Sequence, residues 1–526
     1  MTVTDLTAAP MRQRRNNWNN WVATHAQMRP EATALRFMGQ DTTWAQLHDR
    51  AERLAAALHR RGVRAGDRVV TLTLNRPEFF ESVLAINALG AIAVPVNFRL
   101  TPPELAFIFE DCGAVAAITE PMLAPLLAAV RAQVPAVKMA VCMGAETEGD
   151  VLGYEELLAE DGEPYPPIDL PDDTPCLILY TSGTTGAPKG AVLSHANMVA
   201  QSITCLRALD LQNDDVGLLA APAFHVAALG SVAPALMIGS ITVIHPLREF
   251  NPTDVLDTWE RERVTTCFLV PVQWQAVCAE PTVRERDLAL RAISWGAAPA
   301  SDTILQAMAD TFPDALNVAV FGQTEMSPIT CVLEGKDALR KIGSVGRVIP
   351  TIQARVVDEE MNDVAPGEVG EIVYRGPTMM QGYWNNPQAD ADAFAGGWFH
   401  SGDMVRVDDE GFVYVVDRKK DMIISGGENI YCAEVENALY AHPDIAEAAV
   451  IGRPDPKWHE VPVAVVALKD GVADLTIEAV AEFLGDRLAR YKHPRELVLV
   501  DALPRNASGK VVKHRLRGEI ATEDAG

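Results

Sequence analysis

Residues 176–195 read CLILYTSGTTGAPKGAVLSH, a polar, glycine-rich turn between two short apolar runs. The runs Cys176–Tyr180 and Ala191–Leu193 have the length of β-strands, and the turn holds glycines, hydroxyls and Lys189. Glycines let the backbone approach an anion closely, and hydroxyls and a lysine supply donors and positive charge. The stretch therefore predicts a phosphate-binding loop between two strands. A flexible polar linker is the alternative, which the flanking strand-like runs disfavour.

Length, composition and charge limit the class of protein. A chain of 526 residues predicts two or more domains, and 48% hydrophobic with 22% charged residues is typical of a soluble globular protein. The formal net charge of −26 argues against a general nucleic-acid-binding surface. Eight cysteines without a CxxC pair indicate neither a zinc site nor a disulfide framework. Because no apolar stretch follows the first arginines, we expect no secretory signal and a cytoplasmic protein.

One apolar segment is almost long enough to cross a bilayer. Residues 226–244 carry no charge, but glycines, a proline and a serine interrupt them. Gly239 and Ser240 read as the end of a helix, and Ile241–Ile244 as a strand. We therefore expect a buried helix and a buried strand, with no transmembrane segment.

The order of patterns along the chain predicts an α/β fold. An amphipathic helix at 43–62 is followed by strands at 68–74, 91–96 and 114–119 with helices between them, which is typical of parallel βαβ units. From about residue 340, closely spaced glycines and prolines indicate a β-rich subdomain. The charged run at 417–421 is a plausible hinge, and residues 422–526 read as a small α+β module with helices at 433–440 and 477–488. We predict a large domain over residues 1–416 and a small one over 417–526.

Four further stretches follow short strands or loops and carry chemistry. Small residues at 296–298 leave room for a flat ligand, and the FGQTE stretch at 321–325 offers an aromatic face and a carboxylate suited to Mg²⁺. The carboxylate of Asp403 in WFHSGD could accept hydrogen bonds from ribose hydroxyls. The loop PRNASGK ends with Lys510, which alone would read as a surface lysine.

Together, TSGTTGAPKG, FGQTE, SGD, DRKKDMIISGGENI and PRNASGK, in this order and spacing, resemble the adenylate-forming superfamily, and within it the acyl-CoA synthetases. The resemblance extends from about residue 20 to 515. It implies two half-reactions: a carboxylic acid and Mg·ATP form an acyl-adenylate and pyrophosphate, and coenzyme A then displaces AMP. It also implies a mobile small domain that turns about a hinge at Lys420 between the half-reactions.

The resemblance also implies a role for each matching residue. The catalytic set is Lys510, Thr184 and Glu325, with Glu325 as the magnesium ligand and Lys420 as the hinge. The nucleotide-binding set is Thr181, Ser182, Gly183, Thr184, Thr185, Gly186, Lys189, Gly296, Ala297, Ala298, Phe321, Gly322, Gln323, Thr324, Asp403, Arg418 and Lys510. The acyl-pocket set is Phe224, His225, Leu229, Gly296 and Ala298. The CoA-binding set is Ser425, Gly426, Gly427, Glu428, Trp458 and His459.

The sequence departs from the family pattern at a few positions. Phe321 stands where the family often has tyrosine, and Cys432 where it often has proline. His459 lies in a stretch where the family usually has glycine, near the expected path of CoA. For His225 we favour a packing or gating role over proton transfer, because a substrate carboxylate is already ionised at neutral pH.

The identity of the acid and of the acceptor stays open. The apolar segment after His225 favours a medium- or long-chain fatty acid, with an aryl or polycyclic acid next. One alternative is an adenylating enzyme that passes the acyl group to a carrier protein or an amine. A non-catalytic nucleotide-binding homologue is a second alternative, which the presence of Lys510, Glu325 and Asp403 disfavours. A homodimer also stays open.

Overall fold

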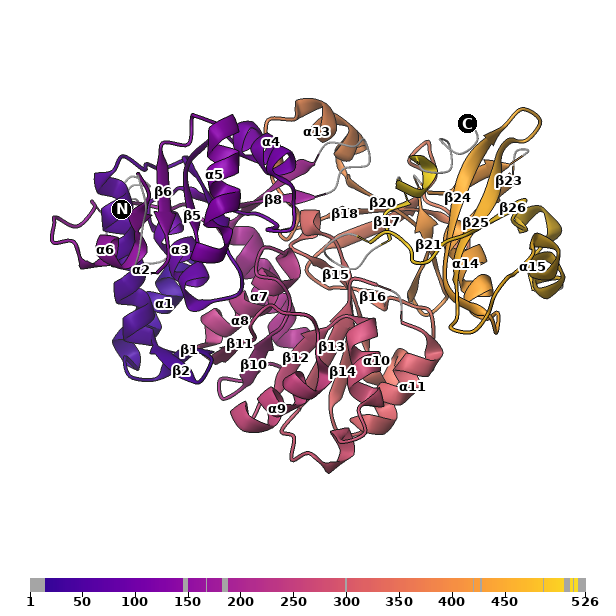
Figure 1. Cartoon of the computed structure of the whole chain (residues 1–526), viewed down its shortest axis with the longest axis horizontal. Coiled ribbons are helices and arrows are strands. Elements are labelled where there is room, and N and C mark those ends of the chain that lie inside the picture. Colours follow the sequence, from indigo (N-terminus) through magenta and orange to yellow (C-terminus); the bar gives the residue numbers. More distant parts are fainter. Residues whose placement is uncertain are drawn as a thin grey trace, which may run out of the picture. The chain divides into compact units, whose positions relative to one another are not determined.

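The computed structural model describes residues 15–144, 150–166, 168–181, 188–298, 300–419, 421–425, 428–485, 487–505, 511–513 and 515–518 (Figure 1). The chain divides into a first unit, Met1–Gln353 with Tyr374–Phe399, and a second unit, Ala354–Val373 with His400–Gly526. The predicted α/β class with parallel sheets is confirmed. The predicted domain division between residues 416 and 417 depends on a hinge and stays a prediction.

A nine-stranded sheet forms one part of the first unit, in the order β16-β15-β14-β13-β12-β10-β11-β1-β2. The strands from β14 to β1 are parallel to their neighbours, whereas β15, β16 and β2 add antiparallel edges. The strands are β1 (Thr33–Phe37), β2 (Gln40–Thr43), β10 (Val216–Leu219), β11 (Ile241–Ile244), β12 (Thr266–Leu269), β13 (Ala292–Gly296), β14 (Leu316–Gly322), β15 (Ile329–Glu334) and β16 (Arg347–Val348).

An eight-stranded sheet forms the other part, in the order β19-β9-β8-β4-β3-β5-β6-β7. It is parallel from β8 to β7, and β8, β9 and β19 are antiparallel to one another. The strands are β3 (Arg68–Leu72), β4 (Ile92–Pro95), β5 (Ala114–Thr119), β6 (Met139–Cys142), β7 (Leu152–Gly153), β8 (Pro175–Thr181), β9 (Lys189–Ser194) and β19 (Gly382–Tyr383).

Helices cover both sheets of the first unit. Helix α7 contacts β9 of one sheet and β15 of the other, so it lies between them, and α9, α10 and α11 flank β12–β14 (Figure 1). The helices are α1 (Trp18–Met28), α2 (Trp44–Arg60), α3 (Pro77–Ala88), α4 (Pro102–Cys112), α5 (Ala124–Gln133), α6 (Tyr154–Ala159), α7 (His195–Ala208), α8 (Val226–Ile238), α9 (Pro252–Glu262), α10 (Pro271–Ala279), α11 (Asp302–Thr311), α12 (Gly335–Ala338) and α13 (Pro387–Ala393).

The uncharged segment at 226–244 forms α8 followed by β11, as predicted. Most of α8 is buried, and Gly239 ends the helix in the left-handed conformation that glycine adopts readily. No helix in the described part of the chain is long and apolar enough to cross a membrane.

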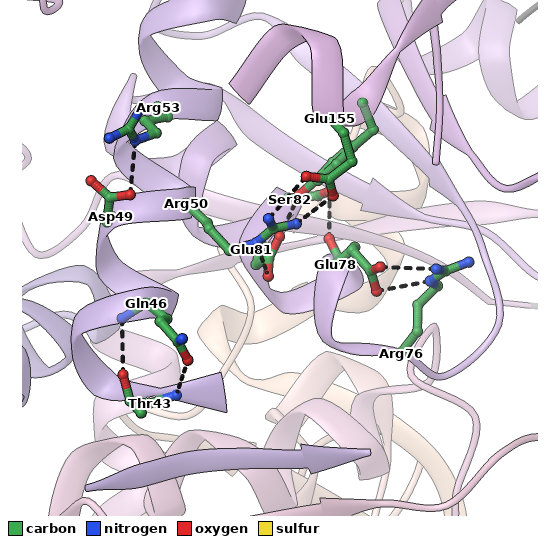
Figure 2. A network of polar contacts seen from close by, with 11 residues as sticks. Thr43, Gln46, Asp49, Arg50, Arg53, Arg76, Glu78, Glu81, Ser82 and Glu155 are labelled. Atoms are coloured by element: carbon green, nitrogen blue, oxygen red, sulfur yellow. Dashed lines mark hydrogen bonds and ion pairs between the residues drawn. The ribbon is translucent and has the colours of Figure 1, made fainter. Parts of the chain in front are cut away.

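Polar contacts fix α2 at its start and along its length (Figure 2). The Thr43 hydroxyl accepts from the Gln46 N–H, and the Gln46 side chain accepts from the Thr43 N–H, a reciprocal cap that explains why the helix begins here. Arg50 donates to Glu81 of α3 at 2.8 Å and to Glu155 of α6 at 2.7 Å. Glu81 is 2% exposed, and burial raises its pKa. Loss of Arg50 would leave a buried charge, at a cost of about 3–5 kcal/mol.

The second unit contains two smaller sheets. A four-stranded sheet in the order β17-β18-β20-β21 corresponds to the expected β-rich subdomain, and a five-stranded sheet carries α14 and α15. Its elements are β17 (Gln353–Val357), β18 (Gly370–Arg375), β20 (Phe399–Val407), β21 (Val413–Arg418), β22 (Ile423–Ser425), β23 (Glu428–Ile430), α14 (Cys432–Tyr440), β24 (Ile445–Asp455), β25 (His459–Leu468), α15 (Ile477–Leu484) and β26 (Glu496–Leu499). The helix predicted at 477–488 ends at Leu484, because Gly485 leaves the helical conformation.

Candidate active site

The predicted phosphate loop connects β8 to β9, two antiparallel neighbours. Thr181 and Lys189 face each other in the register of this pair, and the Thr181 hydroxyl oxygen lies 3.4 Å from the Lys189 carbonyl oxygen. Both ends of the loop are thereby fixed at one edge of the eight-stranded sheet. The predicted phosphate contacts of Ser182, Gly183, Thr184, Thr185 and Gly186 lie outside the described residues and stay predictions.

The neighbouring parallel strands β13 and β14 end at the next two motifs. Gly296 closes β13 beside Val320, and a Cβ atom at position 296 would lie 2.2 Å from the Val320 carbonyl oxygen. A side chain there would push the two strands apart, so the close approach requires glycine. Ala297 and Ala298, which follow, are exposed. The strand ends thus bring the small residues at 296–298 beside the FGQTE stretch.

Residues of the FGQTE stretch differ in burial. Phe321, Gly322, Gln323 and Thr324 are half-buried, whereas Glu325 is 8% exposed. Within the described residues, the buried amide nitrogen Nε2 of Gln323 has no hydrogen-bond acceptor. A buried donor without an acceptor is costly, which is consistent with an acceptor supplied by a ligand.

The Glu325 carboxylate joins two motifs that are far apart in sequence. Its Oε1 accepts from the Thr181 hydroxyl at 3.4 Å and from the Tyr383 hydroxyl at 2.9 Å. The Nζ of Lys189 lies 5.2 Å from the centre of the Tyr383 ring, within cation–π range. The structure therefore brings together Thr181, Lys189 and Glu325, as the motifs predict, and adds Tyr383.

Sequence reasoning missed Tyr383. It lies 58 residues after Glu325, in the two-residue strand β19. The only sequence signal for this strand is its first residue, Gly382. The segment before it is also tied to the site, because the Met380 N–H donates to the Glu325 carbonyl oxygen at 2.8 Å.

The oxygen atoms around Glu325 suit a hard cation. One carboxylate and neighbouring hydroxyls fit Mg²⁺, which usually binds one or two carboxylates together with substrate phosphates. In the described ranges, no group of three or more histidine, cysteine, aspartate or glutamate side chains could hold a metal ion.

Three of the predicted acyl-pocket residues, Phe224, His225 and Leu229, lie just before α8 or in its first turn. The rings of Phe224 and His225 are 4.5 Å apart at the start of the helix, and Phe98 packs edge-on against Phe224 at 5.6 Å. These three rings form an aromatic cluster. Leu229, in contrast, is 2% exposed and lines a cavity of about 10 Å³ with Trp18 of α1 and residues of α3.

In the second unit, Asp403 and Arg418 form an ion pair across β20 and β21, with 2.7 Å between Arg418 Nε and the carboxylate. Asp403 is 2% exposed, whereas the Arg418 side chain is 38% exposed.

A neighbouring carboxylate, that of Glu371, was missed by sequence reasoning. It accepts from the Gly402 N–H at 3.0 Å and from Lys419 Nζ at 3.2 Å, and so supports the part of β20 just before Asp403. Burial opposes the ionised form of Glu371, but hydrogen bonds from His400 and Gly402 lower its pKa below the ordinary value.

Charged groups also surround Asp417, three residues before the predicted hinge. Its carboxylate accepts from the Cys432 N–H at the start of α14 and from the Arg418 N–H. Burial raises the pKa of Asp417 to about 6, against the opposing effect of the nearby Lys513. Lys513 itself pairs with Glu436 at 2.8 Å. Lys420, the predicted hinge, and Lys510 lie outside the described residues.

Of the residues predicted to bind CoA, Ser425 ends β22 and lies between the two neighbouring strands of that sheet. Ser425 pairs with Glu428 of β23 and with His459 of β25, whereas Gly426 and Gly427 lie outside the described residues. His459 has a φ of 73°, a left-handed conformation that favours glycine, which accounts for the expectation of glycine in this stretch. Trp458 beside it is 39% exposed, with Lys457 Nζ 4.9 Å from its ring centre.

Comparison with known protein families finds two matches along the chain. Residues 22–384 match the AMP-binding enzyme family, and residues 434–510 match the AMP-binding enzyme C-terminal domain.

Three curated relatives match over nearly their whole length. A feruloyl-CoA synthase of Amycolatopsis sp is 42% identical over 96% of this chain and 99% of the relative. An indoleacetate–CoA ligase of Aromatoleum aromaticum is 40% identical, with 96% and 98% covered. The long-chain-fatty-acid–CoA ligase FadD13 of Mycobacterium tuberculosis is 36% identical, with 91% and 93% covered.

A solved structure shares the fold. The o-succinylbenzoate CoA synthetase MenE of Bacillus subtilis, in complex with its acyl-adenylate intermediate, superposes with a TM-score of 0.84. It is 31% identical, and 95% of this chain and 98% of that chain are covered. The same enzyme has also been solved with ATP and a magnesium ion.

Proposed function

The chain belongs to the AMP-binding enzyme family, and we propose that it activates a hydrophobic carboxylic acid, with aryl acids first, and transfers the acyl group to coenzyme A. Its class is that of the AMP-forming acid–thiol ligases, with ATP, Mg²⁺ and coenzyme A as the molecules it uses. The observation that carries the proposal is the contact of Thr181 with Glu325. It joins the end of the phosphate-loop strand to the FGQTE carboxylate, 144 residues further on.

The reaction brings two anions together. A carboxylate oxygen of the acid attacks the α-phosphorus of ATP, and the bond to pyrophosphate breaks. The CoA sulfur then attacks the acyl carbon, and the bond from that carbon to the AMP oxygen breaks. Most of the catalytic task is therefore positioning and charge neutralisation, so the protein needs no nucleophilic side chain.

In the first unit, the phosphate loop and Lys189 would hold the β- and γ-phosphates. Glu325 would hold the Mg²⁺ that neutralises their charge. Phe321 would stack on adenine, and Thr324 would contact the α-phosphate. The amide of Gln323, which has no acceptor in the described part of the chain, is available to a ligand there.

The second unit supplies the remaining roles. Asp403 and Arg418 would bind the ribose, and Lys510 would stabilise charge on the reacting carboxylate and α-phosphate. A turn about Lys420 would replace Lys510 with the stretch from Ser425 to Glu428, whose glycines let the pantetheine arm approach the backbone. The ordered Asp403–Arg418 pair supports the ribose assignment, because a paired carboxylate is fixed in orientation.

For the acid, two observations support an aryl group. Phe98, Phe224 and His225 form an aromatic cluster at the start of α8, and two of the relatives are named for feruloyl and indoleacetate substrates. The sequence alone favoured a fatty acid. That class is the second candidate, since FadD13 is also a relative.

The test is acid-dependent exchange of labelled pyrophosphate into ATP. The acid panel contains ferulate, indoleacetate, 2-succinylbenzoate, octanoate and palmitate, each then supplied with CoA or with a phosphopantetheinylated carrier protein. We expect exchange with an aryl acid and thioester formation with CoA.

Glu325→Ala should abolish exchange, whereas Glu334→Ala, at an exposed glutamate at the end of β15, should not. Exchange with none of the acids would contradict the proposal, and transfer only to the carrier protein would replace CoA as the acceptor.

A further inference from the structure

Tyr383 contacts two of the groups assigned to the phosphates and their metal. Its hydroxyl donates to Glu325 Oε1 at 2.9 Å, and its ring lies under Lys189 Nζ at 5.2 Å from the ring centre. None of the motifs that identify the family here includes this residue. The hydroxyl of Tyr383 therefore orients the Glu325 carboxylate, and the face of its ring contacts the Lys189 ammonium group.

The backbone around Tyr383 is fixed from both sides. In β19, Tyr383 pairs with Ala191 of β9, and the flanking Gln381 and Trp384 N–H groups donate to the carbonyl oxygens of Val192 and Gly190 at 2.9 and 2.7 Å. The Tyr383 N–H donates to Asp390 Oδ1 at 2.7 Å.

Helix α7 holds the preceding residues. The Asn197 amide donates to the carbonyl oxygens of Pro377 and Met379 at 2.7 and 2.9 Å. The Met380 N–H in turn donates to the Glu325 carbonyl oxygen. Residues 377–384 thus form a strap that connects the strand after the phosphate loop to Glu325.

A phenol suits this position for a physical reason. It is neutral, so its hydrogen bond orients one carboxylate oxygen and leaves the negative charge available to a cation. An arginine or lysine at this place would neutralise that charge and compete with the cation. A hydrogen bond to an ionised group is also stronger than one between neutral groups, so the orientation is held firmly.

We propose that Tyr383 is a positioning residue, which orients Glu325 toward the Mg²⁺ of Mg·ATP and keeps Lys189 beside the phosphate loop. This role rests on the proposed function. It goes beyond the motif residues by adding a residue that acts through Glu325 without touching the reacting atoms.

The test compares Tyr383→Phe with the wild-type protein by calorimetric titration of Mg·ATP and of ATP in EDTA. The phenylalanine keeps the ring over which Lys189 lies and removes only the hydroxyl. We expect affinity for Mg·ATP to fall about tenfold, with metal-free ATP almost unchanged, and the apparent Mg²⁺ requirement of pyrophosphate exchange to rise about tenfold. Equal affinities of variant and wild type for Mg·ATP, or equal losses for the two forms of ATP, would overturn the proposal.

Two further variants separate positioning from general stability. Tyr165→Phe removes another tyrosine–glutamate hydrogen bond, from Tyr165 to Glu52 at 2.9 Å, and should leave metal dependence unchanged. In the Glu325→Gln background, Tyr383→Phe should have no further effect on Mg·ATP affinity, because the two residues act as one unit. An additive effect would show that Tyr383 does not act through Glu325.

The binding measurement needs no acid, so it distinguishes the two proposals. If no acid supports exchange but Tyr383→Phe weakens Mg·ATP selectively, the proposed reaction fails and the role of Tyr383 stands. If exchange is observed and the variant binds Mg·ATP like the wild type, the reaction stands and the role of Tyr383 fails.

Discussion

Asp403 and Arg418 face each other across β20 and β21, and Arg418 Nε lies 2.7 Å from the Asp403 carboxylate. The carboxylate is buried and the guanidinium is partly exposed, so the pair fixes the orientation of the Asp403 carboxylate.

Asp403→Asn tests the ribose assignment. Loss of the charge weakens hydrogen bonds accepted from ribose hydroxyls, so we expect the KM for ATP to rise about 10- to 100-fold, with a smaller effect on the KM for the acid. Steady-state kinetics with varied ATP measures this. Asp409→Asn makes the same change at an exposed position of the same hairpin and should have no effect. An unchanged KM for ATP in Asp403→Asn would contradict the assignment.

Lys510→Ala should separate the half-reactions. Adenylation should fall about 10²–10³-fold, because a preorganised cation is lost from the reacting phosphate. Thioester formation from supplied acyl-adenylate should remain, since Lys510 would have turned away. Single-turnover assays of the two steps measure this, with Lys469→Ala at an exposed lysine as control. Equal loss of both steps would contradict the exchange of catalytic groups.

Lys420→Pro tests the hinge. Proline fixes φ near −65°, so it should slow CoA transfer more than adenylation. Lys420→Ala removes the same charge and keeps backbone freedom, so it should affect transfer much less. Rates of the two half-reactions, measured separately, provide the comparison. If CoA transfer in Lys420→Pro matches the wild type, the hinge lies elsewhere.

Asp417 predicts a pH dependence of stability in the second unit. Its pKa in the folded protein, about 6, is above the ordinary 3.8, so the stability it contributes is complete below pH 3.8 and is lost as pH rises through about 6. The shift corresponds to about 3 kcal/mol. Of the charged groups near the Asp417 carboxylate, Lys513 lowers its pKa and Glu436 raises it.

Asp417→Asn should flatten this dependence. Hydrogen exchange of α14 amides, corrected for the intrinsic rate, should show less loss of protection from pH 4 to pH 7 in the variant than in the wild type. Asp470→Asn, at an exposed turn of the same unit, is the control and should behave as the wild type. The same pH dependence in Asp417→Asn as in the wild type would show that another group is responsible.

Local chemistry made much of the fold predictable. The alternation of helices and strands predicted parallel sheets, and α8 with β11 agreed with the interpretation of the uncharged segment at 226–244. Helix ends were harder, because a single glycine such as Gly485 decides where α15 stops.

The site was predictable where residues sit in contiguous motifs. Thr181, Lys189 and Glu325 belong to such motifs and do lie together. Tyr383 and Glu371 were not predictable, because they reach their partners through pairing of strands distant in sequence, which leaves no local pattern.

The central claim is activation through an acyl-adenylate, and oxygen transfer tests it most directly. The acid that supports exchange is prepared with ¹⁸O in its carboxylate and incubated with ATP, Mg²⁺ and CoA, and the AMP formed is analysed by mass spectrometry. Attack of the carboxylate on the α-phosphorus predicts one ¹⁸O atom in each AMP. Unlabelled AMP, or ADP with the label in inorganic phosphate, would contradict the account.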